Sequence, residues 1–288
     1  MSRALIPAQR RQMIQDYLET HRVVRLADLV DLLGASEATV RRDLEWLEGQ
    51  GIAERTHGGA ILTQRLPTEP LFSASARAHP DEKDWIGRTA AGLVQSDMTV
   101  FVNSGTTTAA LLRHLRTRAD LSNVTLVTNN LRAVAEPWES GVEILILGGV
   151  FSGRAQSVVG RFSADMLRQL GADLAFIGVD GVSLKYGVTT PSTQEAEIGQ
   201  LMVDRTRGRV YIVADHSKWG VVSNYELARL DQIYGLVVDI GLESGPRTEL
   251  EERGLAVILA APAGETQRSA SSIPREESAH ATVWQEDR

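Results

Sequence analysis

The sequence predicts an α/β protein in which a small helical domain precedes a larger domain built on a mainly parallel sheet. In residues 1–63, apolar side chains recur mostly at helical spacing. In residues 81–262, short continuous apolar runs alternate with amphipathic stretches, as expected for strands buried between two layers of helices. Residues 64–80 contain three prolines and predict a linker with a helical patch over 72–77, and residues 263–288 lack apolar periodicity and predict a disordered tail.

Composition limits the classes of protein that the chain can represent. Its 288 residues, 43% hydrophobic and 23% charged, suffice for two packed domains. The absence of cysteine excludes disulfides, thiolate metal sites and a cysteine nucleophile, and it fits a reducing cytoplasm. Because no apolar stretch approaches about 18 residues, we expect a cytoplasmic protein without a membrane partner. The six histidines are scattered, so we expect neither a metal site nor a cofactor.

The net charge of −7 falls entirely outside the first domain. Residues 1–65 contain nine arginines and nine acidic residues, so the rest of the chain carries the whole excess. A net negative charge argues against non-specific coating of nucleic acid. Any contact of the first domain with DNA phosphates therefore depends on where individual arginines lie.

Two predicted helices of the first domain flank a tight turn. Apolar residues in 26–33 repeat at i, i+3, i+4 and i+7, and Gly34 follows as a C-cap. Ser36 has the character of an N-cap, whose hydroxyl accepts a hydrogen bond from an amide in the first turn. The next helix, residues 36–49, has an apolar stripe that consists of Val40, Leu44 and Leu47. Two helices joined in this way form a helix-turn-helix.

The outer face of residues 36–49 is suited to contact DNA. Small residues at the start of such a helix permit close approach to the bases, and arginines that follow can bind guanine edges or phosphates. The candidate DNA-binding residues on this helix are Ser36, Ala38, Thr39, Arg41 and Arg42. An ordinary amphipathic helix with two solvated arginines shows the same pattern, so that alternative stays open.

A β-hairpin is predicted directly after this helix. Residues 52–56 and 57–62 contain short apolar-alternating runs around a Gly-Gly turn. Such a hairpin makes the domain a winged helix-turn-helix, in which Arg55 and His57 would reach the DNA backbone or the minor groove. For His57, a turn residue without a ligand is the alternative interpretation.

The larger domain is predicted to alternate strands with helices. Strands are predicted at residues 99–102, 124–128, 142–147, 174–178, 210–214, 233–238 and 255–259. Helices are predicted at residues 81–94, 107–115, 131–138, 164–170 and 194–204. This alternation is typical of a parallel sheet whose connections are right-handed.

The first of these strands runs into a small, hydroxyl-rich loop that begins a helix. The loop residues are Ser104, Gly105, Thr106, Thr107 and Thr108. Free amides, hydroxyls and the helix dipole favour an anion there, at the carboxyl end of a parallel strand. Phosphate is the natural ligand of such a loop. An ordinary Ser/Thr-capped helix without a ligand explains the loop equally well on its own.

Polar residues or glycines also follow the next four strands. They include Asn129, Gly149, Asp180 and Lys218. Because the carboxyl ends of parallel strands share one edge of the sheet, these residues can converge on one pocket. Lys218 then offers a point charge to a phosphate or carboxylate, and a solvated loop lysine is the alternative.

These motifs resemble those of the DeoR family of bacterial transcriptional regulators. The resemblance covers residues 7–240 and rests on Thr39-Val40-Arg41-Arg42-Asp43-Leu44, His57-Gly58-Gly59-Ala60, Ser104-Gly105-Thr106-Thr107, Asp180-Gly181 and Asp215-His216-Ser217-Lys218. It implies a sensor domain similar to ribose-5-phosphate isomerase that binds a phosphorylated metabolite. By position, residues 104–108 would hold the phosphate, and Asp180, Lys218 and either Glu195 or Glu197 would face the sugar.

The chain departs from the family pattern at Gly199, where many members have a basic residue. The missing charge would weaken an anion site or favour a different ligand. The resemblance nevertheless implies a repressor of a carbohydrate or polyol operon, a homo-oligomer (dimer or tetramer) that leaves double-stranded operator DNA when a sugar phosphate binds. The competing hypothesis is a sugar-phosphate isomerase with an added DNA-binding domain. Its carboxylate base would be Asp180, Glu195 or Glu197, with Lys218 as the cation.

Overall fold

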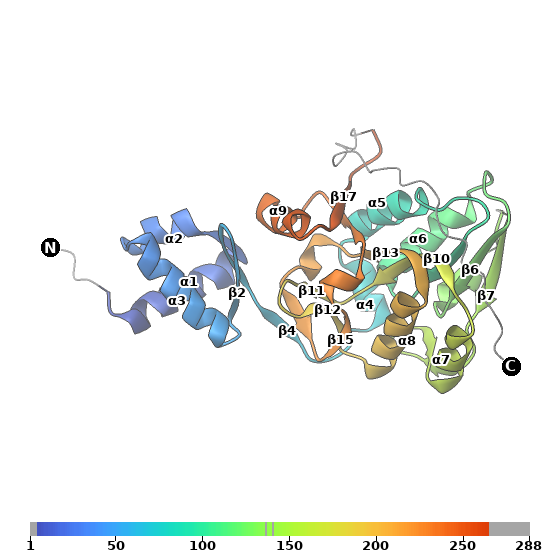
Figure 1. Ribbon diagram of the computed structural model, residues 1–288, viewed down its shortest axis with the longest axis horizontal. Coiled ribbons are helices and arrows are strands. Elements are labelled where there is room, and N and C mark those ends of the chain that lie inside the picture. The colour runs from blue at the N-terminus through green and yellow to red at the C-terminus, as the bar shows by residue number, and fades with distance from the viewer. Residues whose placement is uncertain (1–4, 136, 140, 265–288) are drawn as a thin grey trace, which may run out of the picture.

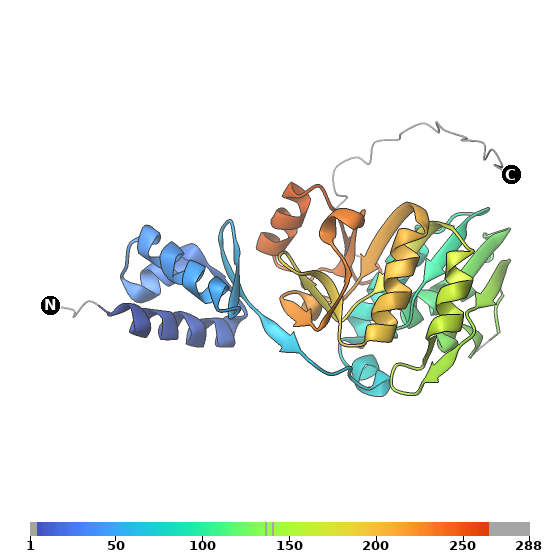
Figure 2. The same cartoon turned by 60° about the horizontal axis from the view of Figure 1, so that its bottom comes forward.

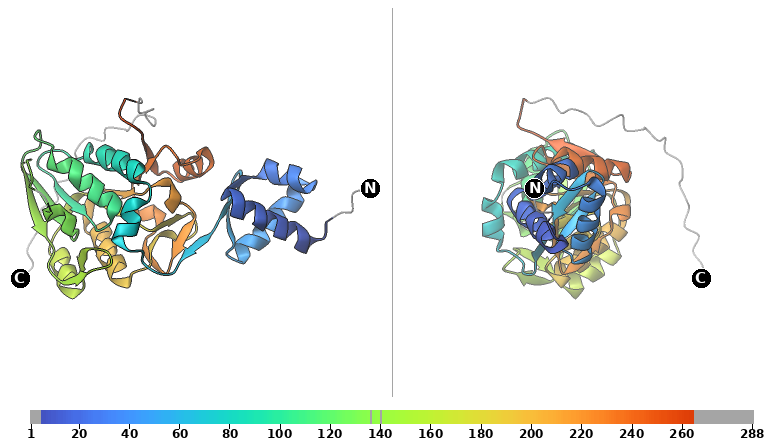
Figure 3. Two further views of the ribbon diagram at one scale, coloured as in Figure 1. Left: turned by 180° about the vertical axis from the view of Figure 1, so that it is seen from behind. Right: turned by 90° about the vertical axis from the view of Figure 1, so that its left-hand side faces the viewer.

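The computed structural model describes residues 5–264, except residues 136 and 140. The described chain forms a smaller and a larger domain that lie end to end (Figures 1 and 3). The predicted tail of residues 263–288 lies outside the described residues, apart from residues 263 and 264. None of the described helices combines the length and the apolar character that crossing a bilayer requires.

The first domain is a winged helix-turn-helix, as predicted. Its elements are α1 (Pro7–His21), β1 (Val23–Arg25), α2 (Leu26–Leu33), α3 (Glu37–Gly49), β2 (Ala53–Thr56) and β3 (Gly59–Leu62). The three strands form an antiparallel sheet in the order β1-β3-β2. Gly34 ends α2 in the left-handed conformation, with φ of 56°.

The inner face of α3 is fixed to α1 by both apolar and charged contacts. The predicted apolar stripe is fully buried and consists of Val40, Leu44 and Leu47. Asp43, on the same face, is only 2% exposed and pairs with Arg10 at 2.7 Å and Arg11 at 3.0 Å. Asp43 therefore joins α3 to α1, and the other face of α3 is exposed.

The segment predicted as a linker holds two short elements. The expected helix is α4 (Phe72–Arg77), and β4 (Gln64–Leu66) was not predicted. β4 pairs in parallel with β14 (Val221–Ser223) of the second domain. Figure 2 shows β4 crossing between the domains and α4 lying against the second one. The second domain therefore holds the chain directly after the wing.

A seven-stranded parallel sheet forms the centre of the second domain, in the order β17-β16-β13-β10-β5-β6-β7. The strands are β5 (Thr99–Val102), β6 (Val124–Thr128), β7 (Val142–Ile146), β10 (Ala172–Gly178), β13 (Thr206–Val213), β16 (Gly235–Asp239) and β17 (Ala256–Ala260). Each overlaps a predicted strand. The apolar runs predicted them correctly because both faces of the sheet are covered.

Helices cover the two faces of this sheet, with α5 and α6 on one side and α7 and α8 on the other (Figure 1). They are α5 (Pro80–Ala91), α6 (Thr106–Arg116), α7 (Arg161–Arg168), α8 (Thr193–Asp204) and α9 (Ser244–Glu252). In β5, Val100 and Val102 pack with α5 and α6, whereas Phe101 packs with α7 and α8. The predicted helix over 131–138 is wrong beyond a short 3-10 turn, η1 (Leu131–Val134), because Pro137 has no backbone N–H to donate to a continuing helix. α9 was not predicted.

Short strands surround the ends of the main sheet. They are β8 (Val150–Ser152), β9 (Ser157–Val159), β11 (Gly181–Ser183), β12 (Gly187–Thr190) and β15 (Tyr225–Ala228). β8 pairs with β9, and β12 pairs with β11 and β15, all antiparallel. These strands, of three or four residues each, were not predicted from the sequence.

Candidate functional site

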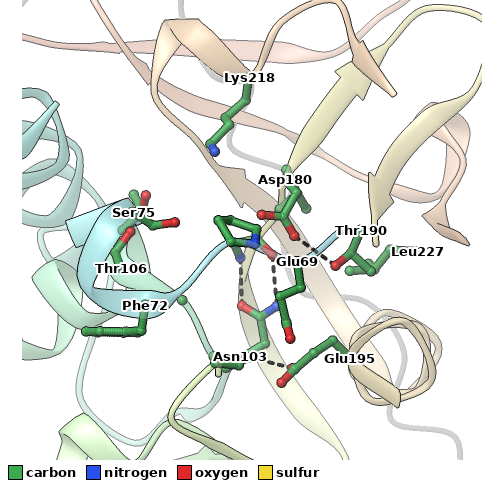
Figure 4. Close-up of a pocket in the computed structure, with 17 residues that line it drawn as sticks. Glu69, Phe72, Ser75, Asn103, Thr106, Asp180, Thr190, Glu195, Lys218 and Leu227 are labelled. Carbon is green, nitrogen blue, oxygen red and sulfur yellow. Dashed lines mark hydrogen bonds between the residues drawn. The ribbon is translucent and has the colours of Figure 1, made fainter. Parts of the chain in front are cut away.

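A pocket lies at the carboxyl ends of the central strands (Figure 4). Its walls come from the loop after β5, the loop after β10, the first turn of α8, the 3-10 turn η2 (His216–Lys218) and the linker. Seven of the ten predicted effector residues line it: Ser104, Gly105, Thr106, Thr107, Asp180, Glu195 and Lys218. The topology therefore brings together residues that are more than a hundred positions apart in the chain.

The N-terminus of α6 opens into this pocket. Gly105 precedes the helix with φ of 131°, a conformation that favours glycine. The amides of Thr106 and Thr107 have no hydrogen-bond acceptor within the part of the chain that the structure describes. First-turn amides left free in this way, together with the helix dipole, form a site for an anion.

Glu195 is a buried junction between several strand ends. Its carboxylate accepts hydrogen bonds from Ser104 Oγ at 2.5 Å, from Asn129 Nδ2 at 3.4 Å and from Ser157 Oγ. Burial raises the pKa of Glu195, these three hydrogen bonds oppose the shift, and nearby Asp180 adds to it. The hydroxyl of Ser104 is thus engaged by Glu195 rather than free for a ligand.

Asp180 and Lys218 form the charged end of the pocket (Figure 4). Thr190 Oγ1 donates a hydrogen bond of 2.8 Å to Asp180. Burial raises the pKa of Asp180, and the positive charge of Lys218 lowers it in part. Lys218 is half-exposed, and its side chain makes no ion pair or hydrogen bond with the described residues. Its ammonium group is available to an anionic ligand.

Three of the predicted effector residues do not line the pocket. Thr108 is buried, and its hydroxyl donates to Gly105 O at 3.0 Å, so it shapes the loop. Asn129 is fully buried behind Glu195. Gly149 has φ of 152°, and a Cβ there would lie 2.5 Å from the carbonyl oxygen of Val159. These residues support the site without reaching a ligand.

The structure distinguishes the two glutamates that the resemblance left open. Glu197 is exposed and lies 3.5 Å from Arg168, so Glu195 is the glutamate of the pocket. At Gly199, a Cβ would lie 2.5 Å from Leu227 Cδ1, and Leu227 itself lines the pocket. A basic side chain at this position would therefore displace Leu227.

The sequence did not single out Asn103 or any linker residue. Asn103 Nδ2 donates to Gly178 O at 2.9 Å, and Gly178 N–H donates to Asn103 Oδ1 at 2.7 Å, so Asn103 joins the ends of β5 and β10. The position of Asn103 directly before the predicted loop could have marked it as a residue of the site. Glu69, Phe72 and Ser75 reach the pocket from the linker, and no sequence pattern marks them.

The predicted DNA-binding residues of α3 lie together at its start. Ser36 occupies the N-cap position, but its hydroxyl lies 2.9 Å from Thr39 Oγ1 and does not bind a backbone amide, which corrects the predicted cap. Arg41 is exposed and pairs with Glu37 at 2.7 Å. Arg42 and Ala38 are exposed, and Arg42 has no charged partner among the described residues. This surface is open to DNA.

The two predicted wing residues face protein in this structure. Arg55 pairs with Glu45 of α3 at 2.8 Å. His57 Nδ1 lies 3.1 Å from Glu249 and 3.4 Å from Glu252, both in α9 of the second domain. The hydrogen bond with Glu249 and the charges of both acids raise the pKa of His57. His57 and the two acids of α9 are too far apart in the sequence for their spacing to predict this contact.

A winged helix-turn-helix joined to an α/β domain with a pocket at its strand ends defines a ligand-sensing DNA-binding protein. The model of the DeoR-like helix-turn-helix domain matches residues 10–65, and that of the DeoR C-terminal sensor domain matches residues 78–240. The chain belongs to the DeoR family and is a transcriptional regulator of the DeoR type.

Relatives of known sequence cover nearly the whole chain. The HTH-type transcriptional regulator GlpR of Haloferax volcanii is 31% identical over 88% of this chain and 98% of its own length. The HTH-type transcriptional repressor GlcR of Bacillus subtilis is 33% identical over 78% and 86%. Among solved structures, ribose 5-phosphate isomerase A of Methanocaldococcus jannaschii matches with a TM-score of 0.36 and 18% identity over 49% of this chain and 55% of its own.

Proposed function

We propose that this protein is a repressor that binds operator DNA through α3 and leaves it when a phosphorylated sugar or polyol enters the sensor pocket. The observation that carries the proposal is the convergence of the α6 N-terminus and Lys218 in one pocket with Asp180. A ligand that contacts all three needs an anionic group and a hydroxylated part. Repression is supported by the similarity to GlcR, which is named as a transcriptional repressor.

The anionic group is placed at the start of α6. The free amides of Thr106 and Thr107 and the positive end of the helix dipole suit a phosphate. Lys218 adds a full positive charge to the same pocket. Gly105 allows the ligand a close approach to the backbone.

The hydroxylated part is placed beside the carboxyl groups. The Asp180 carboxylate can accept hydrogen bonds from sugar hydroxyls, and the Thr190 hydroxyl can exchange hydrogen bonds with them. Glu195 is already engaged by three protein donors. That arrangement disfavours Glu195 as the base of the isomerase alternative, which needs a carboxylate free to take a proton.

A thermal-shift panel of sugar phosphates, polyol phosphates and free sugars tests the pocket. A ligand at a hundredfold excess over its Kd stabilises the native state by about 2.7 kcal/mol. We expect hits among phosphates, and we expect Lys218→Ala to remove them. Lys185→Ala is the matched control, because Lys185 is exposed outside the pocket. Stabilisation by free sugars alone would contradict the phosphate assignment.

DNA recognition is assigned to the exposed start of α3. We expect Arg42→Ala to cost about 1–3 kcal/mol of binding free energy and to relax preference at one base position. The assay uses a DNA sequence that the purified protein selects from a random library. Binding of the protein to this labelled DNA is measured by fluorescence anisotropy. Unchanged affinity and unchanged preference would remove Arg42 from the interface. Arg247→Ala is the control, because it also removes one arginine but from α9, away from α3.

We infer that the protein acts as a homo-oligomer in the cytoplasm, where its DNA is found. Symmetric dimers match paired half-sites on DNA. The apolar side chains of Phe151 and Phe162 are 60% and 73% exposed in the single chain, as expected of surface that a second copy covers. Sedimentation of the native chain and of Phe162→Glu tests this: a monomeric native chain would contradict it.

A further inference from the structure

The chain between the two domains forms a wall of the sensor pocket. Glu69, Phe72 and Ser75 all line it (Figure 4), although they precede the sensor domain proper. We propose that Glu69 is a ligand-contacting residue of this pocket, and that through it the linker itself responds to the bound effector. The inference rests on the proposed function, because it takes this pocket as the effector site.

The second domain holds the linker against the pocket from both ends. Arg154, in the turn between β8 and β9, donates a hydrogen bond from Nε to Glu69 O, and its own carbonyl accepts one from Phe72 N–H at 2.9 Å. Lys83 Nζ donates to Ser75 O and Ala78 O, each at 2.5 Å. The carboxyl group of Glu69 is therefore kept at the pocket wall.

Glu69 adds a third carboxyl group to a pocket that already holds Asp180 and Glu195. Burial, and then the charges of Glu195 and Asp180, raise the pKa of Glu69 to about 7, and Arg154 opposes the shift. Near neutral pH the group thus exists in both forms. The neutral carboxyl can donate a hydrogen bond to a phosphate or sugar oxygen, whereas the carboxylate repels an anionic ligand.

A short path joins this wall to the DNA-binding domain. β4 ends three residues before Glu69, and β14 begins three residues after Lys218. The two strands pair, and Gln64 N–H donates to Gly220 O at 2.9 Å. Two groups of the pocket, the Glu69 carboxyl and the Lys218 ammonium, thus lie at the two ends of one strand pair. A ligand that contacts both sets the position of β4, which continues directly from the wing strand β3.

Calorimetric titration of the full-length chain with inorganic phosphate tests the contact. We compare the native chain, Glu69→Gln and the control Glu226→Gln, an exposed glutamate of β15, at pH 6 and pH 8. We expect Glu69→Gln to bind phosphate roughly tenfold more tightly than the native chain at pH 8, the change that one pKa unit represents, and equally at pH 6. Glu226→Gln should follow the native chain at both values.

The possible results separate the inference from the proposed function. Equal affinity of native and Glu69→Gln chains at both pH values overturns the contact and leaves the anion site standing. Phosphate binding that Lys218→Ala does not weaken overturns the site itself and the inference with it. An absence of phosphate binding in every variant also overturns both.

Hydrogen exchange at saturating phosphate and pH 6 tests the response of the linker. We expect phosphate to slow amide exchange in residues 64–66 and 221–223 of the native chain. Glu69→Ala removes the contact, keeps the α6 amides and Lys218, and should lose this protection while it still binds phosphate. Equal protection in Glu69→Ala would show that the linker does not respond through Glu69.

Discussion

The DNA-binding domain contacts the sensor domain in two places with different chemistry. The wing contact consists of side chains: Glu54 accepts hydrogen bonds from Ser183 Oγ at 2.8 Å and Lys185 N–H at 2.5 Å, and His57 lies against α9. The linker contact consists of backbone: β4 pairs with β14, and Glu69 follows at the pocket.

This difference suggests a division of roles. The linker contact leads directly into the pocket, because Glu69 follows β4 in the chain and lines the pocket. The wing contact includes two titratable side chains, Glu54 and His57, beside the buried Ile61, so its strength depends on pH. In the proposed mechanism a ligand acts first on the linker, and we expect the wing contact to determine how far the DNA-binding domain follows.

The largest expected effect comes from Gly220, which lies against the wing strand β3 and also accepts a hydrogen bond from Gln64 of the linker. This residue has φ of 75°, and a Cβ there would lie 2.7 Å from Ile61 Cγ2. We expect Gly220→Ala to lower the free energy of unfolding by about 2–4 kcal/mol, from backbone strain plus overpacking. Gly254→Ala is the control, because φ is 85° there and the space is open. Equal losses for the two variants in urea unfolding would show that the wing does not pack here.

A smaller effect is expected from the buried carboxyl group of the wing contact. Glu54 is 5% exposed, so Glu54→Ala leaves the Ser183 hydroxyl without its acceptor and Lys185 N–H with only Ser183 Oγ at 3.2 Å, and it should cost about 1–3 kcal/mol. Glu45→Ala, which removes an exposed ion pair with Arg55, should cost less than about 1 kcal/mol. Urea unfolding of both variants provides the measurement, and the reverse order would contradict the contact.

Burial also gives Glu54 a pH dependence of defined sign. Its pKa is raised in the folded protein, so stability falls as pH rises from the ordinary value of 4.5 through the raised value. Glu54→Gln should remove this part of the pH profile of unfolding. An unchanged profile would show that Glu54 does not titrate in the wing contact.

The smallest effect is expected at His57, whose side chain is 80% exposed. Because its pKa is raised in the folded protein, its contribution is fully present below the ordinary value of 6.5 and is lost as pH rises through the raised value. Hydrogen exchange of residues 244–252 should therefore quicken on going from pH 6 to pH 9, after correction for intrinsic rates. His57→Gln should show no such change, and the same quickening in that variant would exclude the histidine.

The sequence predicted the elements whose pattern is local. The central strands are apolar runs, and the stripe of Val40, Leu44 and Leu47 has a helical period that no other element produces. Pocket residues such as Asp180 and Lys218 were identified because they follow such strands, and parallel topology brings their ends together. Pocket residues that do not follow a predicted strand could not be identified in this way.

The residues that join the domains were not predicted, for a physical reason. Glu69 reaches the pocket because Arg154 holds the linker there, a contact between residues 85 positions apart in a segment without periodicity. His57 meets Glu249 across 192 positions. Such contacts depend on how two folded domains pack, and neither propensity nor spacing within one segment encodes that packing.

The central claim is that occupancy of the pocket controls DNA binding, and one measurement tests it directly. Labelled DNA selected by the protein is bound to the native chain and to Lys218→Ala, and anisotropy is followed as the sugar phosphate that gives the largest thermal shift is added. We predict that the native chain releases the DNA at ligand concentrations that stabilise it, whereas Lys218→Ala binds the DNA equally well and keeps it. A native chain that is saturated with ligand and still binds DNA with unchanged affinity would contradict the account.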